Sequence, residues 1–113
     1  MKKLFACVFL FLFSSSVIAA CPRAAATDAP KFCETFKTAA QCHCTTGGLP
    51  AAMCSNIRLL YQRLIVTFGT LEKTCEFQHD TTKEDCLDSW KCYLNGGKNA
   101  AGKLCNGTGR SCP

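Results

Sequence analysis

The sequence lacks the features that mark several common classes of protein. Beyond the first twenty residues its basic residues are scattered singly, and aromatic residues do not interleave with a run of them, so there is no cationic stripe to bind nucleic acid. Its longest apolar run, Leu4 to Phe13, covers about half of a ~30 Å bilayer core and is too short for a permanent transmembrane helix. No serine stands in a nucleophile elbow, and no histidine is placed to serve as its base. We therefore expect no enzymatic activity, no cofactor and no bound metal.

The first twenty residues are typical of an export signal. Lys2 and Lys3 precede the apolar run, and small residues follow it up to Ala19 and Ala20. The short basic start suits a bacterial leader. We predict a signal peptide over residues 1–20 and a single domain over residues 21–113, because a chain of this length can form only one core. The mature chain would carry eleven basic and eight acidic residues, a net charge near +3.

Cysteine is abundant, and one of the eleven, Cys7, lies in the leader. The other ten make up about one residue in nine of the predicted mature chain, a density typical of a secreted disulfide scaffold. Each native disulfide adds about 2–4 kcal/mol, which a small core needs. We expect disulfides formed in an oxidising compartment, using Cys21, Cys33, Cys42, Cys44, Cys54, Cys75, Cys86, Cys92, Cys105 and Cys112.

Two readings of Cys21 remain open. Residues 18–21 resemble the lipobox of bacterial lipoproteins, in which Cys21 becomes the lipidated first residue. Ordinary cleavage after Ala19 or Ala20 fits the same small residues. Parity favours ordinary cleavage, because lipidation of Cys21 leaves nine cysteines and one unpaired thiol. We expect membrane attachment only if Cys21 is lipidated.

Three helices can be drawn from the pattern of apolar and turn residues. The first begins after Asp28, an expected N-cap, and ends near residues 42–44, before Gly47 and Gly48. The third begins at Thr81 or Thr82, either of which gives a capping-box spacing, and ends at Gly96. The tail that follows is irregular, and Cys105 and Cys112 are expected to hold it.

The strongest periodicity lies between the first and third helices. It predicts one long central helix from Cys54 to Cys75. These two cysteines would stand roughly 30 Å apart, so they cannot form a disulfide with each other. If consecutive helices pack antiparallel, the disulfide that we expect first is Cys75–Cys86. The second is a disulfide between Cys54 and either Cys42 or Cys44. The predicted fold class is an all-α, disulfide-rich three-helix domain with one long central helix and an irregular C-terminal tail. The repeat consists of Cys54, Ile57, Tyr61, Leu64, Phe68, Leu71 and Cys75.

Leu59 and Val66 project from the opposite side of this central helix. In one reading, the first and third helices pack on both sides of it and bury these residues. In the other, they form an exposed apolar strip that docks onto a protein partner. They are the candidate interface residues.

A catalytic alternative rests on Cys42-His43-Cys44 with Gly47-Gly48 and the later pair His79-Asp80. These residues faintly resemble secreted phospholipase A2, whose calcium loop and His-Asp pair hydrolyse lipids. Thr45 stands where the first loop glycine belongs, and no further aspartate follows the pair as a calcium ligand. A calcium-dependent hydrolase is therefore an alternative, as is a freely secreted effector or inhibitor.

The leader, the cysteine-rich helices and the segment Trp90-Lys91-Cys92-Tyr93 give a resemblance over most of the mature chain. The chain looks like small exported cysteine-rich bacterial proteins of the "neurogenic locus Notch-like" type. That group includes an accessory subunit of the outer-membrane core complex of the Dot/Icm type IVB secretion system. The resemblance implies a non-enzymatic structural or interaction module of the cell envelope, periplasmic or outer-membrane associated, with a protein partner.

Overall fold

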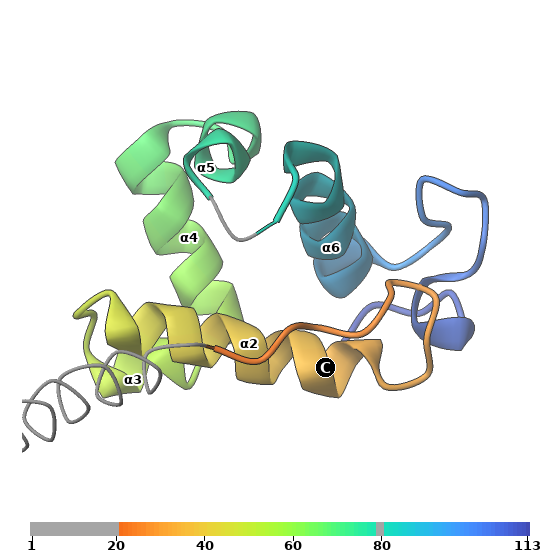
Figure 1. Cartoon of the computed structure of the whole chain (residues 1–113), viewed down its shortest axis with the longest axis horizontal. Helices are drawn as coiled ribbons and strands as arrows, with labels where there is room; N and C mark the ends of the chain where they lie inside the picture. The colour runs from red at the N-terminus through yellow and green to blue at the C-terminus, as the bar shows by residue number, and fades with distance from the viewer. Residues whose placement is uncertain (1–20, 79–80) are drawn as a thin grey trace, which may run out of the picture.

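A computed structural model describes residues 21–78 and 81–113; the predicted leader and the pair His79-Asp80 lie outside them. Figure 1 shows α2 along one edge of the molecule, α4 rising from it, α5 crossing the far end of α4, and α6 returning toward α2. The described residues form α2 (Phe32–Thr46), α3 (Ala51–Cys54), α4 (Ile57–Phe68), α5 (Leu71–Phe77), α6 (Lys83–Asn95) and one 3-10 turn, η2 (Cys105–Gly107).

The all-α prediction is confirmed, but the prediction of three helices with a long central one is wrong. The segment from Cys54 to Cys75 is divided among α3, α4 and α5. Asn56 starts a new helix because its side chain accepts a hydrogen bond from the Leu59 amide at 3.1 Å. Gly69, at φ 91°, ends α4, and the Thr70 hydroxyl then accepts from the Lys73 amide to begin α5.

The heptad repeat nevertheless predicts which side of each helix faces inward. Its members remain on the inner side of their helices, although the chain changes direction near Asn56 and again at Gly69. All seven are buried or half-buried: Cys54, Ile57, Tyr61, Leu64, Phe68, Leu71 and Cys75.

The predicted ends of the outer helices have mixed outcomes. Thr82, one of the two candidate caps, starts α6 by accepting from the Asp85 amide at 3.1 Å, and Gly96 follows its last residue. Asp28 does not cap α2. That helix begins after Lys31 with no side-chain cap, and Asp28 lies in the turn before it.

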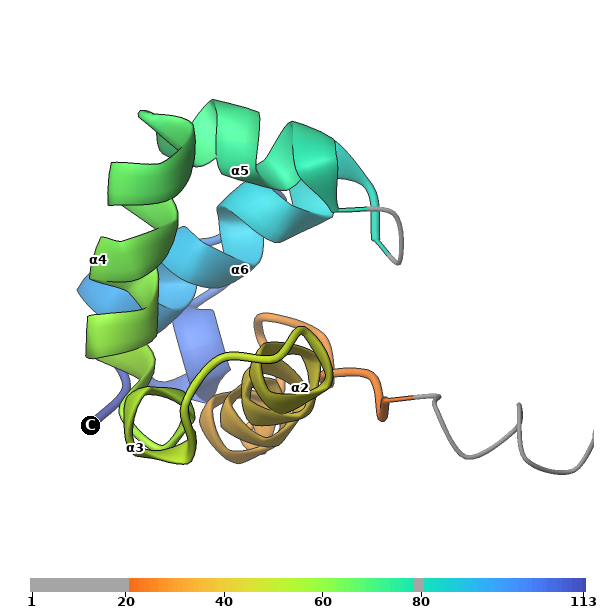
Figure 2. The same cartoon turned by 90° about the vertical axis from the view of Figure 1, so that its left-hand side faces the viewer.

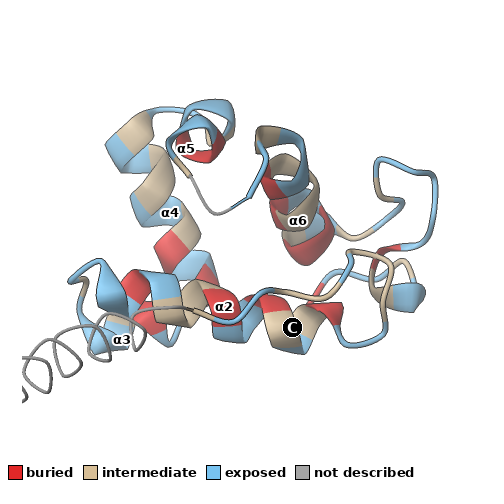
Figure 3. Ribbon diagram, in the orientation of Figure 1, coloured by how far each residue is buried: buried red, intermediate tan, exposed pale blue. Residues whose placement is uncertain are grey.

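An aromatic cluster forms the centre of the core, between α2, α4 and α6. Phe36 meets Trp90 edge to face at 5.0 Å and Tyr93 at 5.1 Å between ring centroids. Tyr61 of α4 lies 5.3 Å from Trp90. Such pairs contribute about 0.5–1.5 kcal/mol each beyond their burial. The buried residues of α2 and α6 lie on the sides that face each other (Figure 3).

All ten cysteines of the described residues form disulfides. The predicted Cys75–Cys86 bridge is confirmed, and Cys54 bonds to Cys44, one of its two expected partners. These bridges indicate an oxidising compartment outside the cytoplasm. Within residues 21–78 and 81–113, no helix has the length and apolar character to cross a membrane. The remaining three bridges are Cys21–Cys42, Cys33–Cys112 and Cys92–Cys105.

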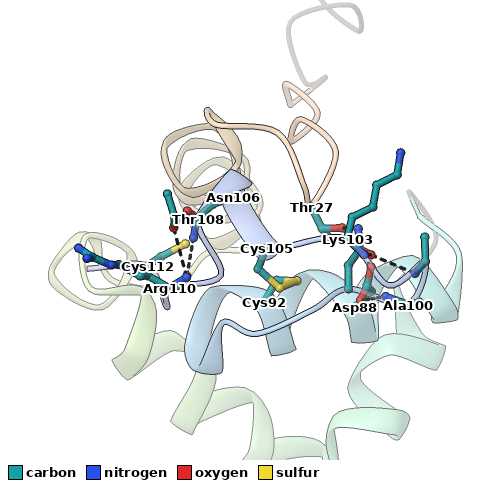
Figure 4. Close-up of a disulfide and its surroundings, with 12 residues drawn as sticks. Thr27, Asp88, Cys92, Ala100, Lys103, Cys105, Asn106, Thr108, Arg110 and Cys112 are labelled. Carbon is teal, nitrogen blue, oxygen red and sulfur yellow. Dashed lines mark hydrogen bonds between the residues drawn. A yellow bond between two sulfur atoms is a disulfide. The ribbon is translucent and has the colours of Figure 1, made fainter.

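The C-terminal tail follows an irregular path across the ends of α2 and α6. As predicted, Cys105 and Cys112 hold it, one to α6 and the other to α2. Figure 4 shows the Cys92–Cys105 bridge beside Asp88, whose carboxylate accepts hydrogen bonds from the Thr27 hydroxyl and the Ala100 amide. One α6 side chain thus ties the N-terminal segment and the tail together.

Candidate interaction surface

The outward side of α4 carries two exposed apolar side chains and one arginine. Leu59, Arg63 and Val66 follow one another at spacings of four and three residues, so they share one side of the helix. Leu59 is 44% exposed and Val66 is 81% exposed. We call these three residues the α4 outer face. The reading in which neighbouring helices bury Leu59 and Val66 is wrong, because α2 and α6 both pack on the other side of α4.

The inward side of α4 explains why the helix holds its place. Ile57 and Leu60 are each 3% exposed, and Leu64 packs against both clusters of the core. At roughly 1.5–3 kcal/mol for each fully buried side chain, this side suffices to anchor the helix. The outer face therefore adds little burial at Val66, and its exposed apolar surface is available for contact.

The charge of α4 is of one sign. The helix contains Arg58 and Arg63 and no acidic residue. Arg58 donates to the carbonyl of Cys112 at 3.0 Å, which links α4 to the tail. Its charge also opposes the effect of burial, which raises the pKa of Tyr93. The Arg63 side chain has neither an ion pair nor a hydrogen bond within the described part of the chain.

Two further apolar side chains are exposed away from the α4 outer face. Phe77, at the end of α5, is 63% exposed and lies 5.0 Å from the ring of Phe68. Leu104 in the tail is 48% exposed. Neither was singled out by the sequence pattern, because single apolar residues near helix ends and turns carry no periodicity.

Of the residues that resemble a phospholipase site, the described segments contain Cys42-His43-Cys44 and Gly47-Gly48. Cys42 and Cys44 are engaged in disulfides, so their sulfurs are not thiolate ligands. No cluster of three or more histidine, cysteine, aspartate or glutamate side chains suited to a metal occurs in residues 21–78 and 81–113. Gly47 and Gly48 end α2, and His79-Asp80 lie outside the described residues.

No protein-family profile matches the chain, and no curated protein or solved structure is significantly similar to it. The sequence pattern correctly predicted that Leu59 and Val66 point to one side of their helix.

Proposed function

We propose that the protein is a non-enzymatic interaction module of the bacterial cell envelope, a candidate accessory component of a secretion apparatus. In this proposal the predicted leader exports the chain, the disulfides form outside the cytoplasm, and a protein partner docks on the α4 outer face. The folded domain supplies a rigid support for that face and carries out no chemistry of its own.

The observation that carries the proposal is the 81% exposure of Val66 on a helix held in place on its inner side. A solvent-facing position on such a helix usually carries a polar residue. Here Leu59 and Val66 flank Arg63 instead. Arginine is enriched among the residues that dominate binding energy, and apolar neighbours exclude water around it. The three residues together have the composition of an interface centre.

The charge of this surface defines the chemistry of the partner. Burying the Arg63 guanidinium without a counter-charge would cost roughly several kcal/mol. A docking partner must therefore supply a carboxylate. The same partner must offer apolar surface to Leu59 and Val66. We infer a protein surface that places at least one aspartate or glutamate among apolar side chains.

Crosslinking in the native host tests this proposal. A photo-reactive amino acid in place of Val66 should crosslink the exported protein to one envelope protein, identified by mass spectrometry. Arg63→Glu should then weaken binding to that purified partner by about tenfold or more. Replacing the opposing carboxylate of the partner by lysine should restore binding to the Arg63→Glu variant.

Lys91→Glu is the matched control, because Lys91 is an exposed cation on α6 with no ion pair in the described residues. It makes the same charge change away from the outer face. Equal affinity of the Arg63→Glu and Lys91→Glu variants for the crosslinked partner would contradict the proposal. Circular dichroism of both variants shows whether the fold is intact.

The two alternatives predict different observations. A calcium-dependent hydrolase should release fatty acid from phospholipid vesicles, and His79→Ala should abolish that activity. A freely secreted effector or inhibitor should be recovered from the culture medium and not from an envelope fraction. Either result would replace the envelope module as the proposed function.

The two fates of Cys21 are mutually exclusive at its sulfur atom. A lipidated Cys21 cannot bond to Cys42, whereas the folded domain pairs the two. This pairing supports ordinary cleavage of the leader and a domain without a lipid anchor. The intact mass of the mature protein, before and after reduction and alkylation, distinguishes the two forms.

A further inference from the structure

A groove lies on the other side of α4 from the outer face. It has a volume of about 1170 Å³ and is bounded by α2, α4, α6 and the N-terminal segment. Figure 2 shows α2 below α5 and α6, with α4 running along one side from the level of α2 to the level of α5. The floor is apolar and is contributed by Phe36, Ala40, Leu49, Leu60, Leu64 and Trp90.

The two edges of the groove differ in charge. Asp85 of α6 lines one edge, and its carboxylate has no ion pair or hydrogen bond within the described residues. Arg23 lines the groove from the N-terminal segment, which runs beside α2 (Figure 1), and its side chain is likewise unengaged in that part of the chain. Asp88 also lines the acidic edge, but Thr27 and Ala100 occupy its oxygens. An occupant therefore meets an apolar floor, a free carboxylate on one side and a free guanidinium on the other.

Residues 21–27, which we call the strap, form the basic edge. All seven line the groove. The Cys21–Cys42 bridge fixes one end of the strap to α2, and the Thr27–Asp88 hydrogen bond of 3.1 Å fixes the other end to α6. Between them the Ala25 amide donates to the Thr35 hydroxyl at 2.9 Å. Arg23 is thus placed at the groove by a covalent bond two residues away.

We propose that this groove binds an amphipathic helix of a protein partner, with a basic residue facing Asp85 and an acidic residue facing Arg23. The volume exceeds the ~300–1,000 Å³ of typical small-molecule sites. An apolar stripe flanked by charges is the pattern that a helix presents to such a groove. Opposite charges on the two edges favour a helix that carries both signs, one on each flank. This site is separate from the α4 outer face and does not depend on it.

Three synthetic helical peptides test the proposal. All three carry the same stripe of leucines. The mixed peptide has lysine along one side of the stripe and glutamate along the other, the lysine peptide has lysine along both sides, and the glutamate peptide has glutamate along both sides. Wild-type protein should bind the mixed peptide most tightly, by roughly threefold to fivefold per matched charge, as expected for exposed pairs. A mixed helix can reverse its direction in the groove, so the order of its flanks does not matter.

Charge reversal on each edge should change this preference in opposite directions. Asp85→Lys makes both edges basic, so the glutamate peptide should become the tightest ligand. Arg23→Glu makes both edges acidic, so the lysine peptide should become the tightest. The control is Glu34→Lys, at an exposed position of α2 that does not line the groove, which should leave the preference for the mixed peptide unchanged.

The strap gives an independent readout. The double variant Cys21→Ser, Cys42→Ser releases the strap near Arg23, and it should lose the advantage of the mixed peptide over the lysine peptide. Binding of all three peptides with equal affinity, or an unchanged preference in both charge-reversal variants, would overturn the proposal. So would displacement of every peptide by dodecylphosphocholine below its micelle-forming concentration, which would indicate a site for acyl chains. Val66→Asp should not alter peptide binding, so this test can fail without affecting the outer face.

Discussion

Helix α4 and the C-terminal tail of the same small domain are ordered by different means. Helix α4 is regular, contains no cysteine and leaves Leu59 and Val66 in solvent. The tail, residues 96–113, has one turn of 3-10 helix, yet Cys105 and Cys112 are almost fully buried. Backbone hydrogen bonds of 2.8 Å join the tail to itself and to the carbonyl of Tyr93 at the end of α6.

This difference indicates where the sequence is constrained by folding. The tail depends on two disulfides and on glycines whose backbone no other residue adopts readily. Helix α4 depends on its inner side, so substitutions on its outer side should cost little stability. A region that the fold leaves free to vary, and that still carries apolar residues around an arginine, is the better candidate for function.

Removing the bridge that holds the end of the tail should cost more stability than any substitution on the outer side of α4. Cys33–Cys112 joins residues 79 positions apart, the longest loop closed by any of the five bridges. The chain-entropy model gives about 4 kcal/mol for a loop of this length. We expect the double variant Cys33→Ala, Cys112→Ala to lose close to that amount in denaturant unfolding. Retention of wild-type stability would show that the tail holds itself in place without sulfur.

Gly96→Ala should destabilise the junction of α6 and the tail by more than about 2 kcal/mol. Gly96 has φ 69°, and a Cβ atom there would lie 2.6 Å from the backbone of Arg110 and of Ser111. The control is Gly97→Ala, since Gly97 has φ 84° but no atom within 4 Å of an added Cβ. It should cost only the ~1 kcal/mol of backbone strain. Equal thermal shifts for the two variants would mean that the tail does not approach Gly96 this closely.

Asn56→Ala should cost about 1 kcal/mol, because it removes the cap that separates α4 from α3. Ser55→Ala is the neighbouring control, since Ser55 is exposed and its hydroxyl bonds only to the carbonyl of Ala52. It should change stability by less than about 0.5 kcal/mol. If α3 and α4 were one continuous helix, Asn56→Ala would instead be neutral or stabilising.

Val66→Asp should have the smallest effect on stability, within about 0.5 kcal/mol, because the side chain is largely in solvent. Leu60→Asp, six residues earlier on the inner side, should prevent folding, since it places a carboxylate in the core. Thermal melts of the two variants compare the two sides of one helix. A large loss of stability for Val66→Asp would contradict the exposed outer face.

Local signals predicted the parts of the fold that depend on neighbours in sequence. The Thr82 cap, the Gly96 stop and the Cys75–Cys86 bridge each follow from a few adjacent residues. The breaks at Asn56 and Gly69 were not predicted, because the apolar repeat continues across both residues. Apolar periodicity reports which side is buried, and it does not require one continuous helix.

The non-local features could not be predicted in the same way. The pairing of Cys33 with Cys112 depends on the path of a tail that has no periodic pattern. The groove depends on where Cys21 bonds, since that bridge holds the strap that carries Arg23 against α2, while Asp85 lines the groove from α6. Neither charged residue stood out in the sequence, because a single exposed charge carries no pattern of its own. The position of Leu59 and Val66 on one side of a helix was predictable, whereas their exposure required the packing of α2 and α6.

A tryptic map of the unreduced mature protein tests most directly the claim that five bridges hold the helices while α4 itself remains unbridged. Trypsin should separate the relevant cysteines, apart from Cys42, Cys44 and Cys54, which share residues 38–58. We expect residues 74–83 linked to 84–91, 92–98 linked to 104–110, and 32–37 linked to 111–113. Residues 38–58 should carry an internal bridge and a link to the peptide that contains Cys21. A peptide with Cys75 bonded to any cysteine other than Cys86, or a free thiol in the folded protein, would contradict this account.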